Sequence, residues 1–117
     1  MAGAFAALAA KTPDISVAII EPSNVLGGQG TAGGGAGFCG DSQRVNAPFS
    51  RLVATLAQHD LIAPFDPCAD RRAYDLELCA FFLQEMVACA SEYISFEPGM
   101  VIDATGVFLK REMATRH

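Results

Sequence analysis

The fold is decided by the stretch ISVAIIE at residues 15–21 and the glycine-dense stretch LGGQGTAGGGAGFCG that follows at residues 26–40. The apolar residues 15–20 are rich in Ile and Val and lie between two prolines, a pattern typical of a buried parallel strand. Glu21 stands at the carboxyl end of this strand, where nucleotide-binding α/β folds hold a ribose hydroxyl. Glycines beyond it let backbone N–H groups approach a phosphate, because no Cβ intervenes.

Composition narrows the class of protein. The chain has 117 residues, of which 51% are hydrophobic and 18% charged, so we expect one small domain with a core. A net charge of -5 argues against a nucleic-acid partner. No apolar run approaches the roughly 18 residues of a membrane span, and no signal peptide is recognisable, so we expect a cytoplasmic protein. The cysteines show no C-x-x-C spacing and predict neither a zinc site nor a disulfide framework.

The first half of the chain predicts helix, strand, loop and helix. Ala2 to Ala10 is an alanine-rich helix that feeds the strand, as in the second half of a βαβ unit. We expect the first strand of that unit and most of its glycine turn to be missing. After an irregular glycine loop, Asn46 is the expected N-cap of a second helix. The core face of that helix has helical spacing and consists of Phe49, Leu52, Val53 and Leu56.

The second half predicts a loop over residues 61–70 and a longer helix over about residues 72–91. We expect Phe81 and Phe82 in the core. One face of the helix is expected to carry Tyr74, Leu78, Phe82, Met86 and either Cys89 or Ala90. A short strand over 93–96 and a last strand over 100–104 follow, with a partly ordered tail at 107–117.

Several short motifs occur in an informative order. Ala2-Gly3 opens the alanine helix, and Glu21 ends the strand. Next come Leu26-Gly27-Gly28-Gln29-Gly30-Thr31-Ala32-Gly33 and, later, VIDATG at residues 101–106. Together they resemble the FAD-dependent oxidoreductases that have a glutathione-reductase-like Rossmann domain. The resemblance implies an α/β fold, namely a partial Rossmann-like FAD-binding domain with a parallel sheet, over residues 1–106.

The resemblance also implies FAD as the cofactor, acting as a hydride or electron carrier. Gly3 would let the helix pack closely on the sheet and present its N-terminus to the pyrophosphate, and Glu21 would accept hydrogen bonds from the adenosine ribose. The glycine loop would run beside the diphosphate or the flavin ring. The implied cofactor-binding residues are Gly3, Glu21, Gly27, Gly28, Gln29, Thr31, Thr105 and Gly106. No catalytic residue and no substrate are predicted.

Three hypotheses for the function follow. The first is a fragment of an FAD-dependent oxidoreductase, weakly active or inactive. It departs from the family pattern at the missing first strand, at a short return path over residues 93–99 and at Val107, which replaces an acidic residue. The second is a non-enzymatic interaction protein that docks on a partner or on another copy through an unpaired strand edge. The third is a nucleotide-binding module that binds ADP as well as FAD.

Three further side chains are candidates for less specific roles. Cys39, near the end of the glycine loop, is either a thiol close to a flavin or a small packing residue. Arg44 and Arg51 are either solvated side chains or contacts for an anionic substrate or the FAD diphosphate.

Overall fold

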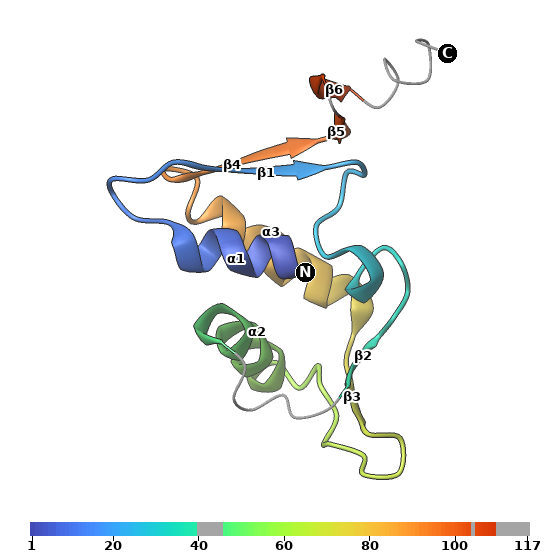
Figure 1. Cartoon of the computed structure of the whole chain (residues 1–117). Helices are drawn as coiled ribbons and strands as arrows, with labels where there is room; N and C mark the ends of the chain where they lie inside the picture. The colour runs from blue at the N-terminus through green and yellow to red at the C-terminus, as the bar shows by residue number, and fades with distance from the viewer. Residues whose placement is uncertain (40–45, 104, 110–117) are drawn as a thin grey trace.

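The computed structural model describes residues 1–39, 46–103 and 105–109 (Figure 1). Its elements follow one another in the order α1 (Ala2–Ala10), β1 (Val17–Glu21), the short 3₁₀ helix η1 (Gly28–Gly30), β2 (Gly37–Cys39), α2 (Ala47–Gln58), β3 (Arg71–Ala73), α3 (Leu76–Ala88), β4 (Ile94–Pro98), β5 (Met100–Asp103) and β6 (Gly106–Leu109).

The centre of the molecule is a parallel pair of strands. β1 and β4 align from Val17 opposite Ile94 to Glu21 opposite Pro98. Helices α1 and α3 lie under the same face of this sheet, and α2 packs against both as a further layer (Figure 1). Parallel strands covered by helices are the α/β arrangement that the sequence predicts. The fold-class prediction is therefore confirmed.

The first two helices follow the predictions closely. α1 has the expected bounds, and α2 begins where Asn46 caps it, because the Asn46 side-chain oxygen accepts a hydrogen bond of 2.8 Å from the backbone N–H of Phe49. The predicted core face of α2 is confirmed, and it comprises Phe49, Leu52, Val53 and Leu56. β1 begins later than expected, at Val17, and Ile15 is 51% exposed.

The third helix corrects two predictions. It begins at Leu76, where Asp75 accepts a hydrogen bond of 2.9 Å from the N–H of Leu78, and not near residue 72. The segment before it forms β3, which pairs with β2 at the end of the glycine loop and was not predicted. The buried face consists of Cys79, Leu83 and Val87 instead of the predicted face through Leu78 and Phe82. Phe81 is 56% exposed, so its assignment to the core was wrong.

The reason for the wrong face is compositional. Residues 76–88 read LELCAFFLQEMVA, in which apolar side chains occupy nearly every register. Helical periodicity cannot then choose between neighbouring faces, and the packing against α2 and β4 decides.

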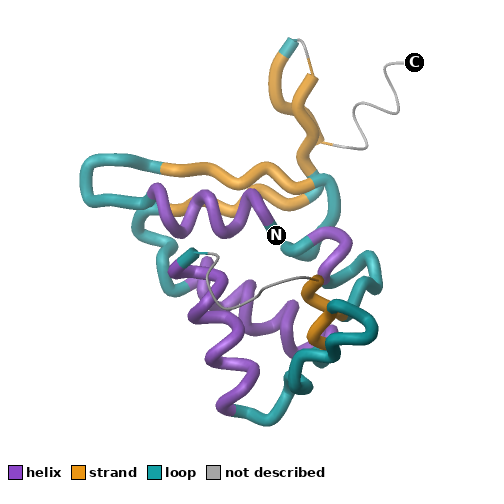
Figure 2. The backbone as a smooth tube through the Cα atoms, turned by 60° about the horizontal axis from the view of Figure 1, so that its bottom comes forward, coloured by secondary structure: helices purple, strands orange, loops and turns teal. Residues whose placement is uncertain are grey.

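The last elements of the described part of the chain form an antiparallel hairpin. β5 and β6 pair from Met100 opposite Leu109 to Asp103 opposite Gly106, and the hairpin projects away from the sheet and the helices (Figure 2). The predicted last strand is confirmed with its end at Asp103. β6 continues to Leu109, so this strand extends into the segment 107–117 that the sequence assigns to the tail. Residues 110–117 lie outside the described residues.

Aromatic rings join the layers at the centre of the core. Phe49 of α2 contacts Phe5 of α1 and Phe38 of β2 edge-on, with ring centroids 5.7 and 4.9 Å away. Phe38 in turn stacks on Tyr74 at 4.1 Å. These contacts fix the end of the glycine loop against the helices. Within the described residues, none of the helices has the length and apolar character needed to cross a membrane.

Candidate functional site

The candidate site lies at the carboxyl end of the parallel strands, where α1 also begins (Figure 1). Glu21 is the last residue of β1 and is half-buried. One of its carboxylate oxygens, Oε1, accepts hydrogen bonds from the N–H and the hydroxyl of Ser23 at 3.1 and 3.0 Å. The other oxygen has no hydrogen bond within the described part of the chain. Glu21 is thus held in place and can still accept a hydrogen bond from a ligand hydroxyl.

The N-terminus of α1 is open on the side of Gly3. Both Ala2 and Gly3 are exposed, and a Cβ built on Gly3 would meet nothing within 4 Å. The N–H groups of a first helical turn have no intrahelical acceptor and carry the positive end of the helix dipole, which favours an anion. Gly3 does not make the expected close approach to the sheet, since the buried small residues of α1 are Ala4 and Ala7.

The glycine loop turns sharply at its start. Gly27 and Gly28 have φ angles of 106° and 55°, which favour glycine. A Cβ on Gly27 would lie 2.5 Å from a methyl carbon of Thr31. Thr31 is 2% exposed, and its hydroxyl donates a hydrogen bond to the carbonyl of Leu26. Gly27 and Thr31 therefore shape the loop from within, whereas a Cβ on Gly28 would meet nothing within 4 Å and that residue faces open space.

The rest of the loop is held by two side chains of the chain itself. The Gln29 side chain packs over Gly33 and Gly35, where added Cβ atoms would lie 2.8 Å from its Oε1 and 3.3 Å from its Cγ. The hydroxyl of Tyr74 lies 2.7 Å from the carbonyl oxygen of Gly30 and 2.9 Å from that of Gly35. Burial and then the neighbouring Cys79 raise the pKa of Tyr74 to about 12, against the opposing effect of Arg71.

Tyr74 is a site residue that sequence reasoning missed, because it was placed on a face of the long helix. Its loop partners precede it by 44 and 39 residues, so no local pattern predicts the contact. The same holds for Arg71 of β3, whose guanidinium donates a hydrogen bond of 3.2 Å to the carbonyl of Ala36.

A hollow of about 500 Å³ opens beside the loop. Its lining includes Gln29 and the loop backbone together with Arg71, Tyr74 and the exposed Cys39. Cys39 faces Arg71 across the β2–β3 pair. We call this hollow the glycine-loop pocket.

Two of the predicted cofactor-binding residues lie elsewhere. Thr105 and Gly106 are at the tip of the β5–β6 hairpin, which points away from the glycine loop in both views (Figures 1 and 2). The structure brings Gly3, Glu21 and the glycine loop to one end of the sheet, but it does not bring this tip to them.

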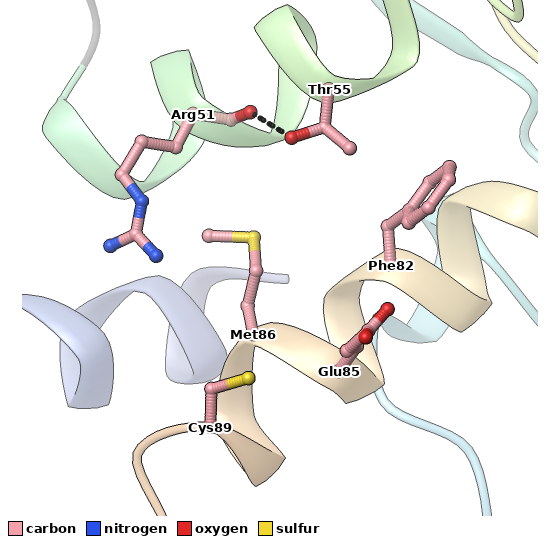
Figure 3. A pocket seen from close by; sticks show the side chains of 6 residues that line it. All are labelled: Arg51, Thr55, Phe82, Glu85, Met86 and Cys89. Atoms are coloured by element: carbon pink, nitrogen blue, oxygen red, sulfur yellow. Dashed lines mark hydrogen bonds between the residues drawn. The ribbon is translucent and has the colours of Figure 1, made fainter. Parts of the chain in front are cut away.

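A second, smaller hollow of about 200 Å³ lies between α2 and α3 (Figure 3). Arg51 and Thr55 of α2 line it, together with Phe82, Met86 and other residues of α3. It contains none of the predicted cofactor-binding residues. Arg51, one of the predicted anion contacts, therefore lies away from the glycine loop, and Arg44 lies outside the described residues.

Comparison with known families agrees with the motifs. The family model described as FAD dependent oxidoreductase matches residues 1–106, from α1 to the start of β6. The chain belongs to the FAD-dependent oxidoreductase family. No curated protein and no solved structure shows a significant match to it. The family membership predicted from the motif order is thus confirmed.

Proposed function

We propose that this member of the FAD-dependent oxidoreductase family binds the adenosine and diphosphate parts of FAD at the carboxyl end of β1. The observation that carries the proposal is the juxtaposition at one end of the sheet of the Glu21 carboxylate, the open N-terminus of α1 and the glycine loop. The residues present fit the group, because Gly3 and Gly28 both leave space where a Cβ would otherwise stand.

Each part of the site has a distinct role in this proposal. Glu21 accepts hydrogen bonds from the ribose hydroxyls through its unoccupied oxygen. The first turn of α1 donates N–H groups to the diphosphate, and Gly3 lets it come close. Gly28 exposes backbone on the loop side. FAD itself supplies hydride or electron transfer when bound, and the chain contributes binding and orientation.

The first experiment is gel filtration of the purified chain with FAD, with flavin absorbance followed through the protein peak. We expect flavin to co-elute with the chain. Glu21→Gln should weaken FAD binding by about 10- to 100-fold, the value of a hydrogen bond to a charged group. Glu92→Gln is the matched control, since Glu92 is exposed in the turn before β4. Equal retention of flavin by the two variants would contradict the proposed role of Glu21.

The Gly3→Ala variant distinguishes an effect on cofactor binding from an effect on the stability of the fold. The added methyl meets nothing in the structure and improves helix propensity, so the free chain should be unchanged or more stable by up to about 1 kcal/mol. Binding of FAD should nevertheless fall, because the methyl occupies the space proposed for the diphosphate. Unchanged FAD affinity would show that the diphosphate does not lie there.

ADP tests how much of the cofactor the chain holds. If the described site contacts only the adenosine and diphosphate parts, ADP should compete with FAD at comparable concentration. A strong preference for FAD would place part of the binding energy at the flavin ring, outside the contacts proposed here.

Self-association is a second candidate function. Among the described residues β1 and β4 pair only with each other, so each strand has an outer edge without a strand partner. Unpaired edges are templates for strand addition by another chain. Sedimentation equilibrium of the FAD-free chain tests this: a stable oligomer that excludes flavin would favour it, and a monomer that binds flavin would reject it.

A further inference from the structure

We propose that Arg71 recognises an oxyanion in the glycine-loop pocket, with the carboxylate of a small organic acid as the substrate class. The inference rests on the proposed function, because it assigns this pocket to the substrate of the same site. It also predicts a binding property of the free chain, which can be measured without FAD.

The charge of the pocket points to an anion. Arg71 is the single charged side chain among the described residues that line it, and no carboxylate does so. Phe38 supplies an aromatic wall, and the hollow of about 500 Å³ lies within the range of small-molecule sites. An arginine that lines a pocket with no carboxylate among its described lining residues favours a ligand that brings its own negative charge.

The position of the guanidinium is set by the β2–β3 pair. Gly37 faces Ala73 across the pair, so Arg71 is its diagonal neighbour. The guanidinium lies across Gly37, where a Cβ would come within 2.6 Å of Nε and 2.7 Å of Nη2. One N–H of Nη2 is used by the carbonyl of Ala36. Within the described residues the other guanidinium donors have no acceptor, so they can bind a carboxylate in the two-point geometry that arginine favours.

The other polar groups of the pocket are consistent with this assignment. The Tyr74 hydroxyl is occupied by the loop carbonyls, so it shapes the wall instead of binding the ligand. Gln29 also lines the pocket, and its amide can donate a further hydrogen bond. A small organic acid therefore suits the pocket, with its carboxylate on Arg71, and succinate serves as the probe.

The test is isothermal titration of succinate, and separately of inorganic pyrophosphate, into the FAD-free chain. Arg71→Gln should weaken succinate binding by at least about tenfold, the value of a hydrogen bond between charged groups. Arg72→Gln is the matched control, because the neighbouring side chain donates to the carbonyl of Ala63 at 2.7 Å and does not line the pocket. Arg72→Gln removes the same positive charge as Arg71→Gln, and we expect it to change the affinity for succinate less than twofold.

Gly37→Ala provides a variant that keeps the charge. The new methyl would displace the guanidinium, so succinate binding should weaken although Arg71 is intact. Thermal unfolding of each variant identifies any that fails to fold.

The outcomes separate the two sources of an oxyanion. Succinate binding that depends on Arg71 supports a substrate site, and binding of pyrophosphate alone that depends on Arg71 supports recognition of an oxyanion of the cofactor type. Absence of binding by both ligands, or equal losses in Arg71→Gln and Arg72→Gln, overturns the inference. Because these titrations contain no FAD, they measure the anion site by itself. A failure of the anion site is therefore distinguished from a failure of the proposed FAD site, which the gel-filtration experiment measures.

Discussion

Replacing Tyr74 by phenylalanine removes a single hydroxyl that ties the glycine loop to the segment after β3. The ring is 7% exposed and stacks on Phe38 with centroids 4.1 Å apart, and a phenylalanine ring at this position would keep these contacts. The hydroxyl lies 2.7 Å from the carbonyl oxygen of Gly30 and 2.9 Å from that of Gly35. The substitution Tyr74→Phe therefore tests the anchoring of the loop alone.

The size of the expected loss of stability follows from the number of hydrogen bonds that the Tyr74 hydroxyl can donate. A phenolic hydroxyl has one proton, so the two carbonyls share one donated hydrogen bond, with a net value of about 0.5–1.5 kcal/mol. A fully buried carbonyl left without a donor would add about 1–3 kcal/mol. Gly30 and Gly35 are half-buried and water can replace the phenol, which favours the lower part of that range. We expect Tyr74→Phe to lower the free energy of unfolding by about 1–2 kcal/mol.

The assay combines urea unfolding with hydrogen exchange of the amides of residues 30–37. Tyr74→Phe should accelerate exchange there selectively, since the anchor of the loop is lost. Tyr93→Phe is the matched control, because Tyr93 is half-buried and its hydroxyl has no hydrogen bond within the described part of the chain. The control should change the free energy of unfolding by less than about 0.5 kcal/mol. If both variants unfold and exchange alike, the anchoring argument is refuted.

The pH dependence gives an independent readout. The fold raises the pKa of Tyr74 from 10.0 to about 12, chiefly by burial, so the folded chain favours the neutral phenol. The stability that this provides is complete below pH 10 and is lost as the pH rises toward 12. The stability difference between the wild-type chain and Tyr74→Phe should therefore shrink above pH 10. Cys79, whose pKa is also raised by burial, lies close enough to raise the pKa of Tyr74, so the difference between the two proteins reports this coupled pair.

Three further predictions concern the fold. Cys79 is fully buried, and its burial, followed by the effect of a nearby acid, raises its pKa to about 11. Iodoacetamide at pH 8 should therefore label the exposed Cys68 and leave Cys79 unmodified, which mass spectrometry would detect. Asn46→Ala should cost about 0.5–2 kcal/mol of stability in urea unfolding, whereas Asn24→Ala, at an exposed position, should have almost no effect. Gly27→Ala should lower the stability by about 1–3 kcal/mol, because the residue has a φ of 106° and no room for a methyl. An unchanged melting temperature would contradict this account of the turn.

The local elements and the family could be predicted from the sequence. Ala2–Ala10, the strand ending at Glu21 and the helix capped by Asn46 each depend on interactions within a few residues: helix propensity, an apolar run between prolines, and an N-cap. The order of short motifs was sufficient to predict the family that matches residues 1–106. It was also sufficient to place a strand-end acid, an open helix start and a glycine loop in one candidate site.

Tertiary structure alone decided the rest. Apolar side chains in nearly every register of residues 76–88 leave the buried face of α3 undetermined until α2 and β4 pack on it. β3 forms because β2 pairs with it across more than thirty intervening residues, and Tyr74 and Arg71 reach the glycine loop for the same reason. Side-chain contacts between segments so distant in sequence follow from packing geometry, which no local period encodes. The hairpin likewise carries Thr105 and Gly106 away from the loop, a placement set by the pairing of β5 with β6 and not by the motif itself.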